Sequence, residues 1–509
     1  MRKLIRYIST LSFICRIVSE IRISDLAIGK HYRKLRWGKC TPPVRMVRFV
    51  CWTLYQLFVA MPKASGSLSI STNISTIPMW LRDPNPYRNH PWEKDPHQAI
   101  PESVDTVVIG AGFTGAASAY HWARRADADK GMVILEKDDP ASGSSGRNEG
   151  LVVMGRYFKM VKDMVQQHLP TVRSDLDSLS QERLAEQFAH YYCVAAYRNG
   201  AQIAETIEKE KFQCQYVRAG WVQARTEDEQ ASLQQSVALA KQTNTPDWQS
   251  ISSEEVRLRT GMRTDHDAGF SKNAASWHPA QWVWCLLKRA LIHPQVDLFT
   301  RTAVQRVRPH GSEYHVFTNR GMLRARHIIY ATESYTPQLE PSFSNAIIPM
   351  QEQAASGTGG PPTMKPHVGI SGSWFFAGRY GKRVLFGSGG ARLSDNEAGR
   401  NQPSRFLTRF VASEMKQHFG AYHIQMENEW SGTVGYTPDQ YPIVGCMDGK
   451  GRYIIAGMCG SGSAVSFNGA RCVVNRILRL TDEPDDYPEK YFAPSRLLSP
   501  DQHCWPEID

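Results

Sequence analysis

The chain has 509 residues, of which 41% are hydrophobic and 21% charged, so it can hold two or three domains with large cores. Its net charge of +11 is concentrated at one end, because residues 1–60 carry twelve Lys and Arg against two acidic residues. The rest of the chain is almost neutral, so electrostatic binding of nucleic acid is not supported. Ten scattered cysteines without C-x-x-C pairs or His/Cys clusters indicate neither a metal site nor a disulfide framework, and they fit an intracellular protein.

Residues 1–60 form a basic segment that allows three interpretations. An Arg-rich, acid-poor stretch is typical of a mitochondrial targeting segment. The apolar run 47–60 (VRFVCWTLYQLFVA) suggests a membrane anchor, but it is shorter than the roughly 20 residues that span a bilayer. Alternatively, the segment is an extension and the functional chain starts at Met61. We favour an extension or a cleaved segment, and so expect no membrane association and a cytoplasmic or mitochondrial location.

Residues 61–101 are expected to be an irregular lead-in to the first domain. Ser and Thr are frequent in its first half, which is typical of a disordered stretch. Prolines recur through its second half and interrupt both helices and strands.

The most specific local signal begins at residue 106, where the run TVVI leads into a G-x-G-x-x-G turn formed by Gly110, Gly112 and Gly115. The first glycine allows a tight turn, the second a close approach to a pyrophosphate, and the third close packing of helix on strand. A helix-forming segment follows, and then a second apolar run that ends at Glu136. This unit predicts a dinucleotide site, with the phosphates at the helix N-terminus and the ribose hydroxyls at Glu136.

The Gly- and Ser-rich run 141–150 (ASGSSGRNEG) predicts a loop. Taken alone, such a run indicates an ordinary surface loop. This one directly follows the second strand of a dinucleotide fold, so we expect it beside the cofactor, with Arg147 and Asn148 as hydrogen-bond donors.

The remaining pattern mixes helices and strands. Residues 151–276 are mostly helical with a strand-like patch at 215–224, and a helix is expected at 281–294. Strands are expected at 296–308, 314–319, 326–332, 373–377, 383–387, 425–430 and 453–456. The turn 457–463 (GMCGSGS) then leads into a helix, which predicts a second helix N-terminus able to bind an anion.

These elements predict an α/β fold in which a Rossmann-like dinucleotide-binding domain is interleaved with an α+β substrate domain built on an antiparallel sheet. We place the cofactor-binding part at about 102–155, 290–335 and 430–480. The substrate part covers about 156–289 and 336–429, and residues 481–509 form a C-terminal tail.

With these motifs in order, the chain resembles the FAD-dependent oxidoreductases of the D-amino-acid oxidase/glycine oxidase/sarcosine oxidase superfamily over about residues 104–480. The matching segments are 107–120 (VVIGAGFTGAASAY), 133–150 (VILEKDDPASGSSGRNEG), 278–290 (HPAQWVWCLLKRA), 304–308 (VQRVR), 326–341 (RHIIYATESYTPQLEP), 347–353 (IIPMQEQ), 384–390 (VLFGSGG), 430–445 (WSGTVGYTPDQYPIVG) and 453–478 (YIIAGMCGSGSAVSFNGARCVVNRIL). The loop at 145–150 is most similar to the gamma-glutamylputrescine oxidase branch, whose usual form is S-G-R-N-G-G; here Glu149 replaces a glycine.

The resemblance implies that FAD contacts come from both ends of the chain. The implied contacts are Gly110, Gly112 and Gly115 at the pyrophosphate, Glu136 at the adenosine ribose, Ser145, Arg147 and Asn148 near the pyrophosphate and isoalloxazine, Val304 at the adenine, and Gly460, Ser461 and Gly462 at the flavin ring.

The resemblance also implies the reaction. FAD would accept a hydride from the carbon next to the nitrogen of an amine or amino acid, giving an imine that hydrolyses, with O2 as the expected electron acceptor. Two alternatives are a dehydrogenase that passes electrons to a protein or quinone, and a non-catalytic flavin-binding protein. The expected partners are thus a small amine or amino acid and an electron acceptor.

Three residues are candidates for substrate contact or catalysis. Arg379 and Tyr380 belong to the strand region before residue 384, where Arg379 could clamp a carboxylate. Glu149 could pair with an ammonium group of a polyamine-like substrate. The plain alternatives are a solvated charge on a hairpin for Arg379 and a surface loop acid for Glu149.

Two cysteines and one histidine are assigned structural roles. Cys446 and Cys459 lie where some members of the superfamily attach FAD covalently, but small buried core residues are the favoured interpretation. His278 precedes Pro279 and is expected to cap or pack at the start of a helix.

Overall fold

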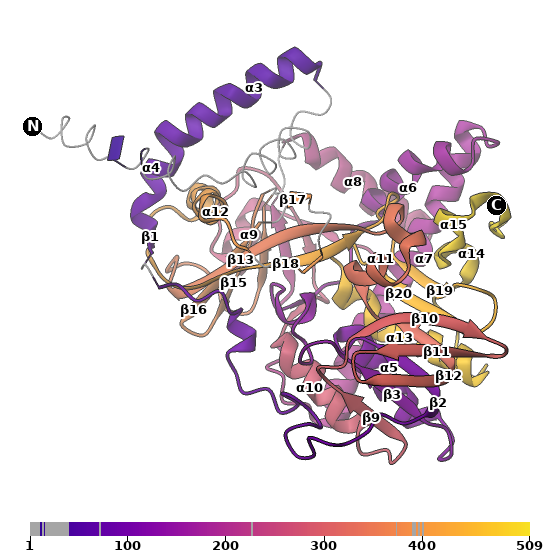
Figure 1. Ribbon diagram of the computed structural model, residues 1–509. Coiled ribbons are helices and arrows are strands. Elements are labelled where there is room, and N and C mark those ends of the chain that lie inside the picture. Colours follow the sequence, from indigo (N-terminus) through magenta and orange to yellow (C-terminus); the bar gives the residue numbers. More distant parts are fainter. Residues whose placement is uncertain are drawn as a thin grey trace, which may run out of the picture.

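The computed structural model describes residues 11–12, 15, 40–70, 73–224, 227–372, 374–388, 393–394, 398–399 and 402–508. Two large β-sheets, one of eight strands and one of ten, form the body, and helices pack against both (Figure 1). The eight-stranded sheet takes its strands from residues 103–135, 296–330 and 443–456, whereas the ten-stranded sheet is built from residues 68–69, 221–271 and 348–436. The chain therefore passes repeatedly between the two sheets, as the predicted fold class requires.

The eight-stranded sheet has parallel strands at its centre. Its central order is β12, β2, β3, β9, with β20 also parallel to β12, while β10 and β11 continue it as an antiparallel meander and β19 pairs with β20. The strands are β2 (Ser103–Ile109), β3 (Met132–Leu135), β9 (Val296–Phe299), β10 (Val304–His310), β11 (Glu313–Thr318), β12 (Gly321–Tyr330), β19 (Ile443–Cys446) and β20 (Arg452–Ala456). Runs of β-branched and aliphatic residues form the central strands because both faces are buried.

Alternate residues of these strands enter two different cores. Val108 and Ile134 pack with the helices α5 (Phe113–Arg125), α10 (Pro279–Ala290) and α13 (Gly462–Leu478). Their neighbours Val107 and Val133 face the second core, which the β10–β12 meander helps to close. The two faces fix the register of β2 and β3, since a one-residue shift would exchange the cores.

The ten-stranded sheet is mainly antiparallel. Its order is β1, β18, β13, β16, β15, β14, β5, β7, β6, with β17 paired to β13. The strands are β1 (Leu68–Ser69), β5 (Trp221–Ala224), β6 (Gln249–Ile251), β7 (Ala268–Ser271), β13 (Ile348–Gly359), β14 (Gly369–Ser371), β15 (Phe376–Tyr380), β16 (Arg383–Gly387), β17 (Leu393–Ser394) and β18 (Ile424–Tyr436). A separate pair joins β4 (Leu151–Val152) to β8 (Ala275–Ser276).

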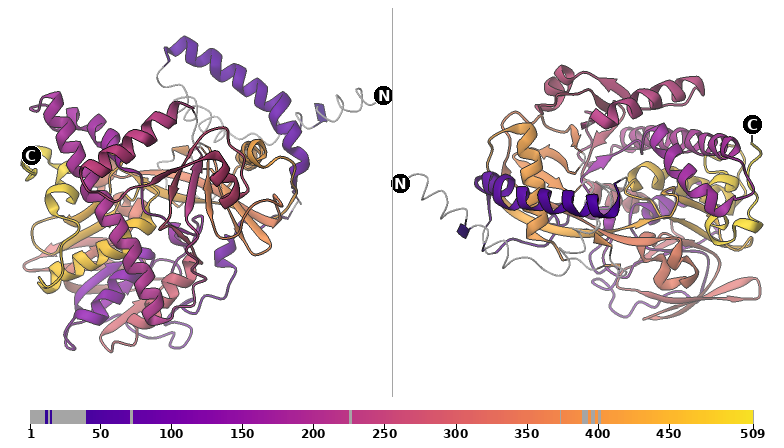
Figure 2. Two further views of the ribbon diagram at one scale, coloured as in Figure 1. Left: turned by 180° about the vertical axis from the view of Figure 1, so that it is seen from behind. Right: turned by 90° about the horizontal axis from the view of Figure 1, so that it is seen from above.

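Further helices cover the outside of this arrangement. The longest, α7 (Ser178–Glu210), packs against α13 and against α6 (Phe158–Val172), and Asp177 caps it by accepting a hydrogen bond from the Ser180 N–H. Figure 2 shows α7 crossing the molecule. The others are α8 (Glu227–Gln242), α9 (Ser253–Thr260), α11 (Thr336–Leu339), α12 (Arg405–Phe419), α14 (Glu489–Phe492) and α15 (Ser495–Leu498).

The expected strands are present with some changed bounds. The pattern at 296–308 is two strands, because residues 300–303 leave the sheet: Arg301 has a φ of +51° and the Thr302 N–H donates to the Glu136 carbonyl. This break carries residue 304 to the end of β3. Residue 373 of the expected strand 373–377 and residues 389–390 of the run 384–390 lie outside the described residues.

The N-terminal helix is longer than the sequence run suggested. Helix α3 (Pro42–Tyr55), a π-helical turn at 56–60 and α4 (Met61–Ala64) form 23 helical residues, long and apolar enough to cross a membrane by length and composition. The length argument made from residues 47–60 is therefore wrong. The outer part of α3 projects from the body (Figures 1 and 2). Its C-terminal end packs on α12, where the rings of Trp52 and Phe410 meet edge-on.

Two expectations about the ends of the body are wrong. Residues 61–101 are more than an irregular lead-in, and residues 481–509 are more than a tail. Residues 68–69 pair with β18, and Trp80 is 2% exposed. In the C-terminal segment, Arg496 is 1% exposed and donates to the Asp439 carboxylate at 2.8 Å and to the Tyr441 carbonyl. The C-terminal segment thus holds the turn before β19.

Removing the Arg496 side chain should strongly destabilise the fold. Arg496→Met leaves the Asp439 carboxylate buried without its partner, which we expect to lower the free energy of unfolding by about 3–5 kcal/mol. Urea denaturation measures this. The control is Arg259→Met, which breaks the exposed pair with Glu255 and should cost less than about 1 kcal/mol. If the two substitutions lowered the free energy of unfolding equally, the proposed role of the buried Arg496–Asp439 pair would be contradicted.

Candidate active site

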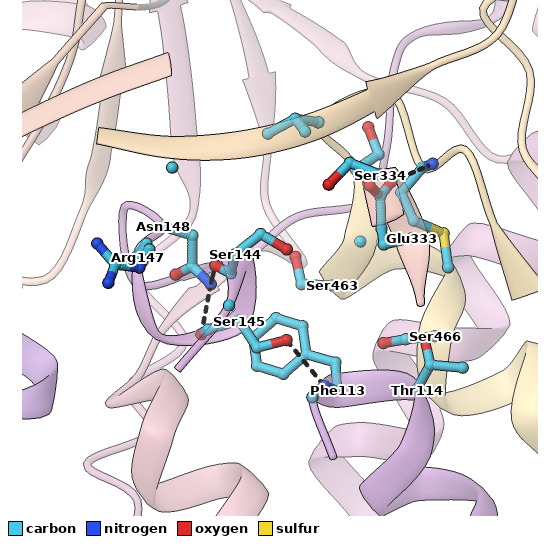
Figure 3. Close-up of a pocket in the computed structure, with 18 of the residues that line it drawn as sticks. Phe113, Thr114, Ser144, Ser145, Arg147, Asn148, Glu333, Ser334, Ser463 and Ser466 are labelled. Carbon is cyan, nitrogen blue, oxygen red and sulfur yellow. Dashed lines mark hydrogen bonds between the residues drawn. The ribbon is translucent and has the colours of Figure 1, made fainter. Parts of the chain in front are cut away.

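Both sheets border one cavity of about 720 Å³ (Figure 3). One side is formed by the carboxyl ends of β2 and β3, the loop 141–149 and the N-termini of α5 and α13. The other side is formed by residues of β5, β13, β15 and β18. This is the position at which open parallel sheets bind their ligands.

The turn after β2 has the close approaches that its glycines predicted. Gly110 has a φ of +106°, and a Cβ there would lie 2.7 Å from the Ala331 carbonyl oxygen. A Cβ on Gly115 would overlap the Gly110 carbonyl, so only glycine lets α5 start this close to the strand. Gly115 itself lies behind the turn and does not line the cavity.

Ser145 joins the loop 141–149 to the start of α5. Its hydroxyl accepts a hydrogen bond from the Phe113 N–H at 2.8 Å, as Figure 3 shows. A Cβ on Gly112 would lie 2.7 Å from this oxygen, so the second glycine makes room for Ser145 as well as for a ligand. A side chain from the loop therefore caps this helix end.

A second helix N-terminus reaches the same cavity. Helix α13 begins at Gly462, and Ser461 before it makes no side-chain capping bond. Gly460, with a φ of +85°, Ser461 and Gly462 line the cavity, and Figure 3 shows Ser466 of α13 beside Thr114 of α5. The partial positive charges of two helix N-termini thus favour an anionic group there.

The carboxylate of Glu136 lies at the carboxyl end of β3. It accepts the N–H groups of Ala111 at 2.7 Å and Asp138 at 2.9 Å, and burial raises its pKa. Val304 lines the same end of the cavity because of the break between β9 and β10. The structure therefore brings together the residues expected at the adenosine half of FAD.

The loop 142–150 is held by hydrogen bonds to its backbone. Arg147 donates to the carbonyls of Ser142 and Ser431, and Asn148 donates to those of Ser144 and Ser145. The carbonyls of residues 147, 148, 149 and 150 accept hydrogen bonds from Trp430 Nε1, Trp80 Nε1, Tyr380 Oη and the Trp277 N–H, respectively. Arg147 and Asn148 line the cavity, but these donors are used within the protein.

Of the three proposed substrate contacts, the structure brings only Glu149 to the cavity wall. The Arg379 guanidinium donates to the carbonyls of Met364, Gly359 and Pro361, so its geometry favours holding that loop over clamping a substrate carboxylate. Tyr380 lies behind Glu149, where its hydroxyl holds the loop backbone.

Glu333 is a cavity residue that the sequence reasoning missed. Its carboxylate accepts the N–H groups of Gly435 at 2.7 Å and Met458 at 2.9 Å, and so ties the end of β12 to β18 and to the turn before α13 (Figure 3). Burial raises its pKa to about 7. The only local signal was an acid directly after a buried strand.

The structural roles expected for Cys446, Cys459 and His278 can be compared with their surroundings. Cys459 lines the cavity, but its thiol donates to the Gly457 carbonyl and burial raises its pKa, which favours the neutral thiol. The pKa of Cys446 is also raised by burial. The interpretation of His278 as a cap is confirmed, since its ring accepts the Gln281 N–H at the start of α10.

Fold and site together define a dinucleotide-binding protein with room for a second, small ligand. The residues fit FAD: a glycine turn that a Cβ would fill, an acid after the second strand, and two helix N-termini at a cavity large enough for a cofactor and a substrate. A family model described as "FAD dependent oxidoreductase" (DAO) matches residues 105–476. The chain therefore belongs to the DAO family, and its cofactor is FAD.

Known proteins of similar sequence match only parts of the chain. The chain is 22% identical over 267 residues to gamma-glutamylputrescine oxidoreductase of Escherichia coli K12, covering 51% of this chain and 56% of that protein. It is 28% identical over 118 residues to one component of the anaerobic glycerol-3-phosphate dehydrogenase of the same strain, covering 23% of this chain and 19% of that one. The matches thus span about half or less of these relatives.

Solved structures share the fold. L-proline dehydrogenase from P. horikoshii has a TM-score of 0.61 at 17% identity, covering 78% of this chain and 98% of that chain. Glycine oxidase from Bacillus cereus has a TM-score of 0.57 at 16% identity, covering 75% and 96%. L-amino acid deaminase from Proteus vulgaris, in a form with its specific insertion sequence deleted, has a TM-score of 0.59 at 19% identity, covering 78% and 94%.

Substituting Gly115 should impair FAD retention. In Gly115→Ala the new methyl group would overlap the Gly110 carbonyl, so the turn must move, at a cost of about 1–3 kcal/mol. We expect the variant to purify largely without flavin, measured by the ratio of flavin to protein absorbance. Gly66→Ala is the control, because no atom lies within 4 Å of its Cβ position. Normal flavin content in Gly115→Ala would contradict the role of this glycine.

Glu333 should make the stability of the FAD-free protein depend on pH. Its folded pKa of about 7 lies above the unfolded value of 4.5, so the folded state binds more protons between these values. Stability should therefore fall as pH rises from about 4.5 to 7, by up to roughly 1.4 kcal/mol per pH unit from this group.

Glu333→Gln should remove that contribution. The readout is the slope of unfolding free energy against pH, measured by urea denaturation of wild type and variant, because the carboxamide also changes the hydrogen bonds. Parallel slopes would show that Glu333 does not titrate in this range.

Proposed function

We propose that the protein oxidises the C–N bond of a small amine or amino acid and passes the electrons to O2. The observation that supports this most is one continuous cavity with two unlike ends. Glu136, the glycine turn and the helix N-termini suit a dinucleotide, whereas the end against β5, β13 and β18 has room and polar groups for a separate small molecule.

The balanced overall reaction for a primary amine is R–CH2–NH2 + O2 + H2O → R–CHO + NH3 + H2O2. FAD, when bound, supplies the acceptor for the hydride from the carbon next to the nitrogen. The nitrogen loses a proton, and water then hydrolyses the imine to the aldehyde and ammonia.

The chain's own part is to position the substrate and tune the charge of the site. The N-terminus of α13 can stabilise negative charge where Gly460 and Ser461 line the cavity. Aromatic side chains on the opposite wall limit water near the reacting carbon: Tyr157, Trp221, Trp248, Phe376 and Tyr436. No acid–base pair is needed for the carbon–hydrogen bond, which fits the lack of such a pair among the predicted residues.

Anaerobic mixing with candidate substrates tests this function. We expect at least one compound in a panel of primary amines, N-methyl amino acids, L-amino acids and D-amino acids to bleach the flavin absorbance of the holoenzyme. Readmitted air should restore the absorbance and yield one peroxide per substrate. If no compound bleaches the flavin, the proposal fails.

The same experiment separates an oxidase from a dehydrogenase. Bleaching by substrate, followed by slow recovery in air and fast recovery with a quinone or dye, would assign the electrons to an acceptor other than O2.

A further inference from the structure

Two carboxylates, Glu149 and Glu352, line the cavity close enough to interact electrostatically. Glu149 lies near the end of the loop 142–150. Glu352 lies on β13, where it pairs with Gly432 of β18. Gln351 and Gln353 point to the other side of β13, where they bind Thr433 and Thr408, so strand alternation turns Glu352 towards the cavity.

The loop and the strand are held at a fixed separation. Arg147 donates to the Ser431 carbonyl, and the Trp430 indole donates to the Arg147 carbonyl, which fastens the loop to β18. The Tyr436 hydroxyl donates to Glu352 at 2.6 Å. The two carboxylates are thus brought close enough for Glu352 to affect the ionisation of Glu149.

Glu149 is the less satisfied of the two acids. Its carbonyl accepts the Tyr380 hydroxyl, but within the described part of the chain no donor contacts its carboxylate. Burial, with a smaller contribution from Glu352, raises its pKa to about 8. With no donor from the described residues, the charged form of this carboxyl group would be stabilised by a cation from outside the chain.

The neighbouring wall also suits a cation. Trp221 and Trp248 meet edge-to-face with ring centroids 4.8 Å apart, and Trp221 is fixed by a bond from its indole N–H to the Ser371 hydroxyl. Tyr157 and Phe376 add two further rings. Aromatic rings attract ammonium groups and shield them from water.

The basic side chains that the structure describes at the cavity are already engaged by the protein. Among the described residues, the basic side chains that line the cavity are Lys137, Arg147, Arg156 and Arg301. Arg156 donates to the Gln440 and Cys459 carbonyls. Arg301 pairs with Asp139, and Lys137 lies over the Tyr335 ring 3.8 Å from its centroid, both at the adenosine end.

We propose that Glu149 and Glu352 form an ammonium-binding subsite, and that the substrate is a cationic alkyl amine of the diamine or polyamine type, without a carboxylate on the reacting carbon. This inference rests on the proposed function, because it names the substrate class of the same reaction. The remote ammonium of the substrate lies between the two carboxylates, while the reacting nitrogen is neutral.

A non-reactive cation tests the subsite without turnover. Butyltrimethylammonium should bind the holoenzyme, measured by isothermal titration calorimetry and by a shift of the flavin spectrum, whereas pentanoate should not. Glu149→Gln and Glu352→Gln should each weaken this binding by about tenfold or more, with flavin content unchanged. Glu149→Asp keeps the charge and should lose less affinity than Glu149→Gln.

The control is Glu205→Gln, an exposed acid on α7, which should leave binding unchanged. Tighter binding of pentanoate than of the cation, or unchanged affinity in both cavity variants, would overturn the subsite.

Binding of this probe should depend on pH, although the probe itself carries a permanent charge. Among the described residues, Glu352 of β13 acts on Glu149, and Tyr380 of β15 interacts with it; burial raises the pKa of Tyr380, so its hydroxyl remains neutral. Affinity should therefore rise as pH increases through about 8, and Glu149→Gln should remove this rise. If the wild-type affinity for the probe did not change between pH 6 and 9, the role of Glu149 ionisation in binding would be contradicted.

Turnover tests the substrate class with matched compounds. Norvaline is butylamine with a carboxylate on the reacting carbon, and 1,4-diaminobutane is butylamine with a second ammonium. We expect kcat/KM to be highest for 1,4-diaminobutane and at least tenfold lower for either enantiomer of norvaline. Preference for norvaline overturns the substrate class but leaves C–N oxidation standing, whereas failure of the whole amine and amino-acid panel overturns the proposed function itself.

Discussion

The backbone of the loop 142–150 is fixed between the two sheets, and the geometry of the site depends on this constraint. Four successive carbonyls of the loop accept hydrogen bonds from segments far apart in the sequence. Each bond contributes about 1 kcal/mol, but together they allow the loop a single path. The same path places Ser145 at the start of α5 and Glu149 near Glu352. One loop therefore sets both the cofactor end and the substrate end of the cavity.

Charge in the cavity is divided along its length. The N-termini of α5 and α13 give one side a positive character, which suits phosphates and reduced flavin. The opposite wall carries Glu352 among aromatic rings, and Glu149 ends the loop on the near side. Glu333, between them, binds two backbone N–H groups and joins three segments of the fold. Such a separation orients a dipolar or cationic ligand before any chemistry occurs.

The parts of the site that could be predicted from sequence are those set by local spacing. The glycine turn, Glu136 and the GMCGSGS turn are short segments whose backbone geometry follows from their own residues. Arg379 looked equally suitable as a charge beside a strand, but its position depends on carbonyls of a loop 15–20 residues earlier in the chain.

Residues that act through distant neighbours could not be found in this way. Glu333 matters because β18 and the turn before α13 lie next to it, and Glu352 because Gly432 and the loop 142–150 do. The aromatic wall gathers rings from separate elements of the α+β part. No short-range pattern marks such residues, since sheet topology alone brings them together.

The contact between Trp80 and the loop also bears on where this enzyme begins and ends as a folding unit. The family match covers residues 105–476. Outside it, the Trp80 indole N–H donates to the Asn148 carbonyl beside Glu149, and Arg496 forms an ion pair with Asp439. A shortened protein cut to the matched region would keep every recognised motif and lose two of the ties that shape the pocket around them.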